Sequence, residues 1–237
     1  MSLVTHPMVM WVRGALRSAG LTRPIALLFL GGKGYEEPVD TALFDAIKIG
    51  DVVWDVGANV GLYTVKFANA VGSAGHVCAF EPSPLNLGRL HAACLGYDNI
   101  TIHSVGLSAE PGRLAFAQGE DELGATSKLV RSTGTGNTIE VSIKRGDDLV
   151  ANHEAPCPNV VKIDVEGHEH KVLAGLTETL RNPLLRTLII EVHFRLLKEN
   201  DAADAPKEIE QTLSRNGFKV RWVDASHICA TRVPTAR

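Results

Sequence analysis

Hydrophobic and polar positions along the chain form two alternating patterns. Short apolar runs have the length of buried strands, and segments with apolar residues three or four positions apart have the spacing of amphipathic helices. The predicted strands are 52–54, 76–80, 100–105, 160–163 and 188–192, and the predicted helices are 60–70, 84–95 and 169–180. Because such alternation requires right-handed crossovers, it predicts an α/β fold with a mostly parallel sheet covered by helices on both faces.

The beginning of the chain and one internal stretch depart from this alternation. Apolar residues at helical spacing over 8–19, followed by a second helix at 39–48, predict a helical cap over residues 1–48. Residues 111–137 are polar and rich in Gly and Thr, and short alternating pieces flank them. We therefore expect a hairpin insertion at about 111–144.

The C-terminal part of the chain adds a helix at 206–215 and two further strands. The pieces 218–223 and 227–230, joined by a turn at 224–226, predict an antiparallel pair. Together with the earlier strands, they give a seven-stranded sheet that ends in an antiparallel strand. A chain of 237 residues suits one core. We expect a single domain with a Rossmann-like core over residues 49–237.

Composition narrows the functional classes. The net charge of -3 and the low aromatic content give no basic, aromatic-rich surface, so nucleic acid is not an expected partner. The four cysteines form no CxxC pair, which fits free thiols in a reducing compartment. The apolar run 25–30 is too short for a transmembrane helix, and no cleavage site follows it. These observations predict a cytoplasmic enzyme and leave its oligomeric state open.

A glycine-rich turn carries the first chemical signal. Residues 55–61 read DVGANVG and lie between a predicted strand and a predicted helix. Gly57 permits backbone angles that other residues rarely adopt, and Gly61 lets the helix start close to the strand and to a ligand. The turn could merely be a tight connection, but this context favours a nucleotide-like ligand.

An acidic residue about 20 positions later strengthens this hypothesis. Glu81 ends the strand 76–80, where a carboxylate accepts hydrogen bonds from ribose hydroxyls. A dinucleotide site would need a third glycine where Val60 stands, and Asp55 would repel a pyrophosphate. The carboxylate of Asp55 suits instead the cationic amino group of a methionine moiety.

Two pairs of polar residues lie at the ends of later strands. Lys162 and Asp164 fall on one side of the strand 160–163, and Glu191 and His193 repeat this spacing in the next one. Lys162 and Asp164 could form a buried ion pair, but the carboxyl end of a strand also faces the ligand in open sheets. His193, oriented by Glu191 or assisted by Asp164, could remove a proton from an attacking alcohol.

Other roles for this region remain open. Asp164, Glu166, Glu191 and His193 could hold magnesium or manganese, but the pattern does not require a metal and we predict none. Glu166 could also cap the following helix. His168 and His170 have the positions of surface or helix-start residues, and we assign them no catalytic role.

Three motifs resemble the FkbM family of S-adenosylmethionine-dependent methyltransferases. They are DVGANVGLYT at 55–64, AFEPSP at 79–84 with Asn86, and KIDVEGHE at 162–169 with Val172, Leu173 and Gly175. YEEP at 35–38 and GLS at 106–108 also look like that family, and the resemblance covers about residues 35–193. It implies a class I methyltransferase fold and an S-adenosylmethionine cofactor, with a hydroxyl group of a sugar, glycan or natural product as the acceptor.

The resemblance also implies which residues bind the cofactor. The methionine side would be lined by Asp55, Gly57, Ala58, Asn59, Gly61, Tyr63 and Thr64, the ribose by Glu81 followed by Pro82, and the adenine by Leu107 and Ser108, with Glu37 reaching the same pocket. Tyr63 and Thr64 also fit ordinary packing and capping at a helix start.

The expected function is therefore S-adenosylmethionine-dependent O-methyl transfer to a small molecule, sugar or glycan. Two other functions remain as alternatives. A non-catalytic module could keep the adenosine pocket, although an intact Asp164 and His193 argue against this. A nicotinamide-dependent reductase is disfavoured by the missing third glycine.

Overall fold

A computed structural model describes residues 37–117, 128–130 and 138–234. The helix predicted over 8–19 lies outside these residues. The side chain of Glu37 also lies outside them, although its backbone begins the first described helix. Among the described residues, no helix has the length and apolar character needed to cross a membrane.

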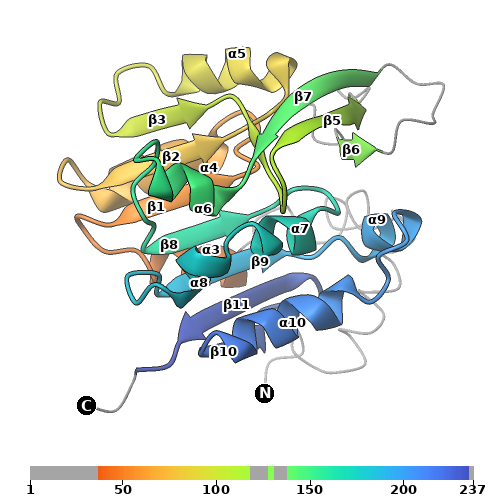
Figure 1. The fold of residues 1–237 in the computed structure, drawn as a ribbon. Coiled ribbons are helices and arrows are strands. Elements are labelled where there is room, and N and C mark those ends of the chain that lie inside the picture. Colours follow the sequence, from red (N-terminus) through yellow and green to blue (C-terminus); the bar gives the residue numbers. More distant parts are fainter. Residues whose placement is uncertain (1–36, 118–127, 131–137, 235–237) are drawn as a thin grey trace, which may run out of the picture.

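The central sheet has the predicted mostly parallel architecture (Figure 1). Its seven strands follow the order β10-β11-β9-β8-β1-β2-β3. They are β1 (Val52–Val56), β2 (His76–Phe80), β3 (Ile100–His103), β8 (Val160–Ile163), β9 (Thr187–Glu191), β10 (Phe218–Trp222) and β11 (His227–Arg232). β11 is antiparallel to both neighbours, and the other pairs are parallel. The antiparallel C-terminal strand is thus confirmed.

Helices cover both faces because successive residues of a buried strand point to opposite sides. Val53 and Val77 pack on the face of α3 (Glu37–Phe44) and α4 (Leu62–Val71), and Ala79 packs there against α5 (Pro84–Ala93). Trp54 and Val161 face the other layer. That layer contains α6 (Gly146–Ala151), α7 (Glu169–Ala174), α8 (Thr177–Arg181) and α10 (Ala205–Arg215), while the short α9 (Phe194–Glu199) follows β9.

The helix predicted over 169–180 is divided into α7 and α8. Both oxygens of the Asp147 carboxylate accept hydrogen bonds from the first turn of α8, at 2.9 Å from the N–H groups of Glu178 and Thr179. A carboxylate in this position satisfies the free donors of a new helix start. The break therefore depends on a residue 31 positions away from Glu178, which helical periodicity does not reveal.

A smaller sheet projects beside the main one and has the order β4-β7-β5-β6 (Figure 1). Its strands are β4 (Gly106–Leu107), β5 (Gly112–Ala117), β6 (Lys128–Val130) and β7 (Thr138–Lys144). β5 and β7 pair antiparallel and fall on the two alternating pieces that flank the polar stretch. β4 pairs parallel with β7 and brings Leu107 and Ser108 toward the main sheet.

The strand order reverses between β1 and β8. From β1 the chain adds β2 and β3 on one side, and from β8 it adds β9 on the other. Ligands of open α/β sheets bind outside the carboxyl ends of the strands at such a point. The glycine-rich turn after β1 and Asp164 after β8 lie at this position.

Candidate functional site

The glycine-rich turn packs directly against the end of β8. Gly57 has a φ of +82°, and a Cβ atom added to it would lie 1.9 Å from the carbonyl oxygen of Asp164. Gly61 precedes α4 with a φ of +89°. Only glycine meets both demands at position 57, because the backbone angle and the contact each exclude a side chain. The turn is thereby fixed beside Asp164.

Glu81 lies at the next strand end and is almost completely buried. Its carboxylate accepts hydrogen bonds from the N–H groups of Asn59 and Ser83, each at 2.8 Å. Burial raises the pKa of Glu81, whereas these hydrogen bonds act in the opposite direction. The loop after β1 and the loop after β2 are therefore held together by one carboxylate.

Several buried polar atoms around Glu81 have no hydrogen-bond partner within the part of the chain that the structure describes. They are Asn59 Oδ1, Ser83 Oγ and Asn86 Oδ1. Unpaired buried polar atoms are costly and call for an explanation, for example a ligand that hydrogen-bonds to them. Ribose hydroxyls and an adenine amino group have donors of the required kind. These residues thus fit the nucleoside of S-adenosylmethionine, the cofactor expected of the family.

Asp55 has different partners from those that the sequence predicted. Its side chain is fully buried, it accepts a hydrogen bond of 2.6 Å from Thr64 Oγ1, and it lies 3.3 Å from Lys162 Nζ. Lys162 also lies 3.5 Å from Asp164, so the expected Lys162–Asp164 pair is a triad in which Asp55 is the closer carboxylate. Burial lowers the pKa of Lys162, but Asp55 and Asp164 raise it more strongly.

The expected contact between Asp55 and the cofactor ammonium group stays a prediction. Asp55 Oδ1 lies near Lys162 Nζ but has no hydrogen-bond partner among the described residues. Thr64 donates its hydroxyl hydrogen bond to Asp55. The hydroxyl of Tyr63 donates to Asp40 of α3 at 2.7 Å, and the Tyr63 ring centre lies 5.3 Å from Lys162 Nζ. These contacts fix the side chains of Asp55, Tyr63 and Thr64 beside the glycine-rich turn.

His193 lies at the centre of a group of carboxylates. Its Nδ1 is 2.7 Å from Glu169, and its Nε2 is 3.3 Å from Glu166 and 3.7 Å from Asp164. The side chain of Glu169 is fully buried and also accepts the N–H of Gly167. The hydrogen-bonded partner of the imidazole is thus Glu169, whereas the sequence predicted Glu191 in this position. Glu166 faces His193 and does not cap α7.

The proton affinities at this cluster depart strongly from the ordinary values. Burial alone lowers the pKa of His193, but the hydrogen bond and charge of Glu169, with the charges of Glu166 and Asp164, raise it to about 10. Burial raises the pKa of Glu166 to about 7, against the opposing charge of His193. Glu166 and His193 are therefore neighbouring groups whose pKa values lie near and above neutral pH, and their protonation is coupled.

One of the two residues predicted for the adenine, Ser108, contacts His168. Leu107 is buried, and Ser108 Oγ is hydrogen-bonded to His168 Nε2 at 2.9 Å. Burial, with smaller effects from His170 and Lys171, lowers the pKa of His168 to about 4. His168 is thus a neutral partner of Ser108, and it also has the expected helix-start position as the N-cap residue of α7. Pro82 lies close to the same strand, 3.6 Å from a Cβ atom added to Gly106.

Glu191 comes near His193 but has another immediate partner. One oxygen atom each of Asp164 and Glu191 and one nitrogen of His193 lie within 4.8 Å of one another, a spacing that a divalent ion would also tolerate. Glu191 Oε2 is 3.4 Å from His227 Nε2, and His227 Nδ1 is 2.9 Å from Asp224 Oδ2. Sequence reasoning missed both residues, although a register that pairs the last strand with β9 would have placed His227 beside Glu191.

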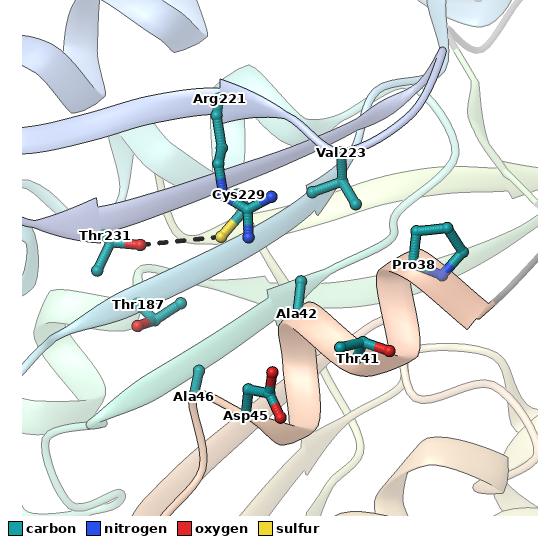
Figure 2. A pocket seen from close by; sticks show the side chains of 10 residues that line it. All are labelled: Pro38, Thr41, Ala42, Asp45, Ala46, Thr187, Arg221, Val223, Cys229 and Thr231. Carbon is teal, nitrogen blue, oxygen red and sulfur yellow. Dashed lines mark hydrogen bonds between the residues drawn. The ribbon is translucent and has the colours of Figure 1, made fainter. Parts of the chain in front are cut away.

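A cavity of about 660 Å³ lies elsewhere, between α3 and the sheet (Figure 2). Its lining includes Ala42 on α3, Asp45 directly after that helix, and Thr187, Arg221 and Cys229 on the strands. None of the predicted site residues lines it. We therefore place the candidate site at the carboxyl ends of β1, β2, β8 and β9, where the titratable groups and the unpaired polar atoms meet.

The sheet order, the glycine-rich turn at the switch point and the buried acid after β2 define a class I methyltransferase. A profile of the methyltransferase FkbM domain matches residues 55–220. The chain belongs to the FkbM methyltransferase family. This membership disfavours the nicotinamide-dependent reductase.

Two relatives support the assignment by sequence. The chain is 33% identical over 180 residues to the hexuronic acid methyltransferase AglP of Haloferax volcanii, covering 76% of this chain and 68% of the relative. It is 30% identical over 203 residues to the 31-O-demethyl-FK506 methyltransferase FkbM of Streptomyces tacrolimicus, covering 73% and 75%.

A solved structure supports the fold. The crystal structure of a methyltransferase FkbM from Methylobacillus flagellatus aligns with a TM-score of 0.51 and 17% identity, covering 76% of this chain. The present chain spans 43% of that longer chain.

Proposed function

We propose that this protein transfers the methyl group of S-adenosylmethionine to a hydroxyl oxygen of a sugar, a glycan or another small molecule. The observation that carries the proposal is the position of His193: its Nδ1 is held by Glu169, and its Nε2 is directed at the carboxylates at the switch point. The names of the two relatives, one acting on a hexuronic acid and one at a 31-O position, support an oxygen acceptor on a small molecule or sugar.

The cofactor is held by the residues around Glu81. The Glu81 carboxylate receives the ribose hydroxyls, and the unpaired atoms of Asn59, Ser83 and Asn86 supply further partners. Leu107 and Ser108 form the wall on the adenine side. When bound, S-adenosylmethionine supplies an electrophilic methyl group.

The proton of the acceptor hydroxyl passes to His193 Nε2. Because an alcohol with a pKa of about 16, near that of water, attacks poorly, a positioned base contributes a factor of about 10² to 10⁴. His193 accepts the proton in its neutral form, and because its pKa is raised to about 10, the imidazolium must first release a proton to the solvent. Glu169 keeps the ring in place during both transfers.

One experiment tests the whole proposal. The protein is incubated with methyl-labelled S-adenosylmethionine and a cell extract, and the labelled product is identified. We expect label on an oxygen of a sugar or small molecule, loss of labelling in His193→Ala and Asp164→Asn, and normal labelling in His91→Ala, a control at an exposed helical position. Label on nitrogen or carbon would contradict the proposal.

Binding measurements separate the remaining alternatives. S-adenosylmethionine and S-adenosylhomocysteine should each raise the melting temperature, whereas NAD and NADP should not. A protein that binds S-adenosylmethionine but labels nothing in any extract is the non-catalytic module. A chelator should leave the activity unchanged. If magnesium restores activity after chelation, then Asp164, Glu191 and His193 form a metal site instead.

A further inference from the structure

The turn between β10 and β11 reaches the candidate site from the end of the chain. β11 is antiparallel to both β9 and β10, so the start of β11 lies at the same edge of the sheet as the end of β9. His227, the first residue of β11, is directly opposite Glu191, the last residue of β9. Opposite residues of antiparallel neighbours project from the same face, so their side chains meet.

Asp224 and His227 form a chain of contacts that starts at the backbone and ends at Glu191. Asp224 Oδ1 accepts the N–H groups of Ser226 and His227, both at 2.8 Å, which fixes the carboxylate to the turn. His227 Nδ1 lies 2.9 Å from Asp224 Oδ2, and Nε2 lies 3.4 Å from Glu191 Oε2. The imidazole therefore bridges a fixed carboxylate and the strand-end carboxylate.

This arrangement is costly if it serves the fold alone. The side chains of Asp224, His227 and Glu191 are 13%, 14% and 18% exposed. Removing charges from water is unfavourable, and well-packed apolar residues in place of a buried ion pair often stabilise a fold as well or better. Burial lowers the pKa of His227, but Asp224 and Glu191, which face it from the turn and from β9, raise it to about 9. The imidazole is thus hydrogen-bonded to Asp224 on one side and ion-paired with Glu191 on the other.

Glu191 joins this pair to the proposed proton acceptor. It is within 4.8 Å of both Asp164 and His193, measured between one polar atom of each side chain. The geometry points to Asp224 and His227 as a positioning pair that orients the Glu191 carboxylate toward the acceptor, where it binds an acceptor hydroxyl beside His193. This inference rests on the proposed function, because it assigns the acceptor side of the same site. The inference predicts that β10, β11 and the turn between them complete the acceptor side of the site.

A double-mutant cycle tests whether His227 acts through Glu191. The variants are His227→Gln, Glu191→Gln and the double variant, with His76→Gln at the start of β2, the opposite end of the parallel strands, as a matched control. The assay measures labelled methyl transfer into the acceptor fraction of the extract. We expect His227→Gln to reduce kcat/KM for the acceptor by about 100-fold, the scale of a misplaced group. The affinity for S-adenosylhomocysteine should stay within twofold, and His76→Gln should resemble the wild type.

The decisive comparison is made in the Glu191→Gln background. If His227 acts through Glu191, His227→Gln has little further effect there, because its target is already lost. If the two losses multiply, or if cofactor affinity falls with the acceptor affinity, then His227 is a structural residue and the inference is wrong. A retained melting temperature in each variant excludes simple unfolding.

A measurement without an acceptor keeps this inference separate from the proposed function. Titration of the His227 ring by NMR should give a pKa near 9 in the wild type and lower values in Asp224→Asn and Glu191→Gln. An ordinary pKa in the wild type would show that the bridge does not exist and would overturn the inference, whatever the acceptor. If the wild type shows the raised His227 pKa but transfers no methyl group to oxygen, the proposed function is overturned instead.

Discussion

At the scale of single residues, Glu81 joins two loops and is the residue proposed to bind the cofactor ribose. Glu81→Gln keeps the size of the side chain but replaces one acceptor oxygen by an NH₂ group, opposite the N–H of Asn59 or Ser83. We expect the affinity for S-adenosylhomocysteine to fall by about 1.5 to 3 kcal/mol, the usual scale for hydrogen bonds to a charged group. Calorimetric titration measures this change. Glu110→Gln, at an exposed position, is the control and should bind normally.

The pH dependence of turnover reports on His193 and Glu169. Neutral His193 is the form that accepts a proton, so turnover should rise with pH toward the raised pKa of about 10. Glu169→Gln removes the charge that helps to raise this pKa, so the rise should move to lower pH while the maximal kcat falls. Glu178→Gln, at a side chain that is 72% exposed, serves as the control. An identical profile in Glu169→Gln would mean that another group limits the rate.

Several site residues could be predicted because strand ends in open sheets gather around the ligand. Glu81, Asp164 and His193 each occupy such an end, and their predicted proximity follows from this rule. Glu169 was missed because its position in the sequence also fits a helix start, and only the folded chain brings it to His193. The pairing of Asp55 with Lys162 was missed for a related reason, since it crosses from β1 to β8.

At the scale of elements, periodicity located the long segments and failed for short ones. The predicted strand boundaries agree with β2 and β8, because four buried residues in succession are distinctive. α6 and α9 have six residues each, which is less than two helical turns, so periodicity has little to detect. The division between α7 and α8 depends on the distant Asp147, which local sequence does not encode.

Alanine substitutions at two glycines, Gly175 and Gly88, test how closely the elements pack beside Ser108. A Cβ atom at Gly175, between α7 and α8, would lie 2.1 Å from the carbonyl oxygen of Ser108, whereas one at Gly88, in α5, would meet nothing within 4 Å. Gly175→Ala should therefore destabilise the protein by about 1 to 3 kcal/mol and weaken cofactor binding, because it displaces the backbone beside Leu107. Gly88→Ala should stabilise it by about 0.5 to 1 kcal/mol. Urea denaturation and calorimetry measure both effects. Equal stability of the two variants would contradict the close packing of Ser108 on Gly175.

At the scale of the whole molecule, β10 and β11 form one edge of the main sheet, and the turn between them brings Asp224 and His227 to the site. One side chain of β11, Arg232, connects these strands to the rest of the protein. Its guanidinium donates to the carbonyl oxygens of Leu180, Asn182, Leu185 and Asn216 at 2.7 to 3.1 Å. It also lies over the ring of Phe218, 4.3 Å from the ring centre. The end of the chain is thus attached to α8, to the loop before β9 and to the end of α10.

The last prediction follows from this attachment. Arg232→Lys retains the charge but cannot reach four carbonyl groups with one ammonium, because lysine lacks the planar fork of arginine. Since hydrogen bonds to charged groups contribute about 1.5 to 3 kcal/mol each, and lysine keeps some of them, we expect a net loss of about 2 to 4 kcal/mol in the free energy of unfolding. Arg113→Lys, whose ion pair with Glu140 is exposed, should change it by less than about 1 kcal/mol. Urea denaturation shows the difference as a lower midpoint with an unchanged slope. If Arg232→Lys unfolds at the wild-type midpoint, the C-terminal strands are held by sheet pairing alone, and the turn at Asp224 does not depend on this clamp.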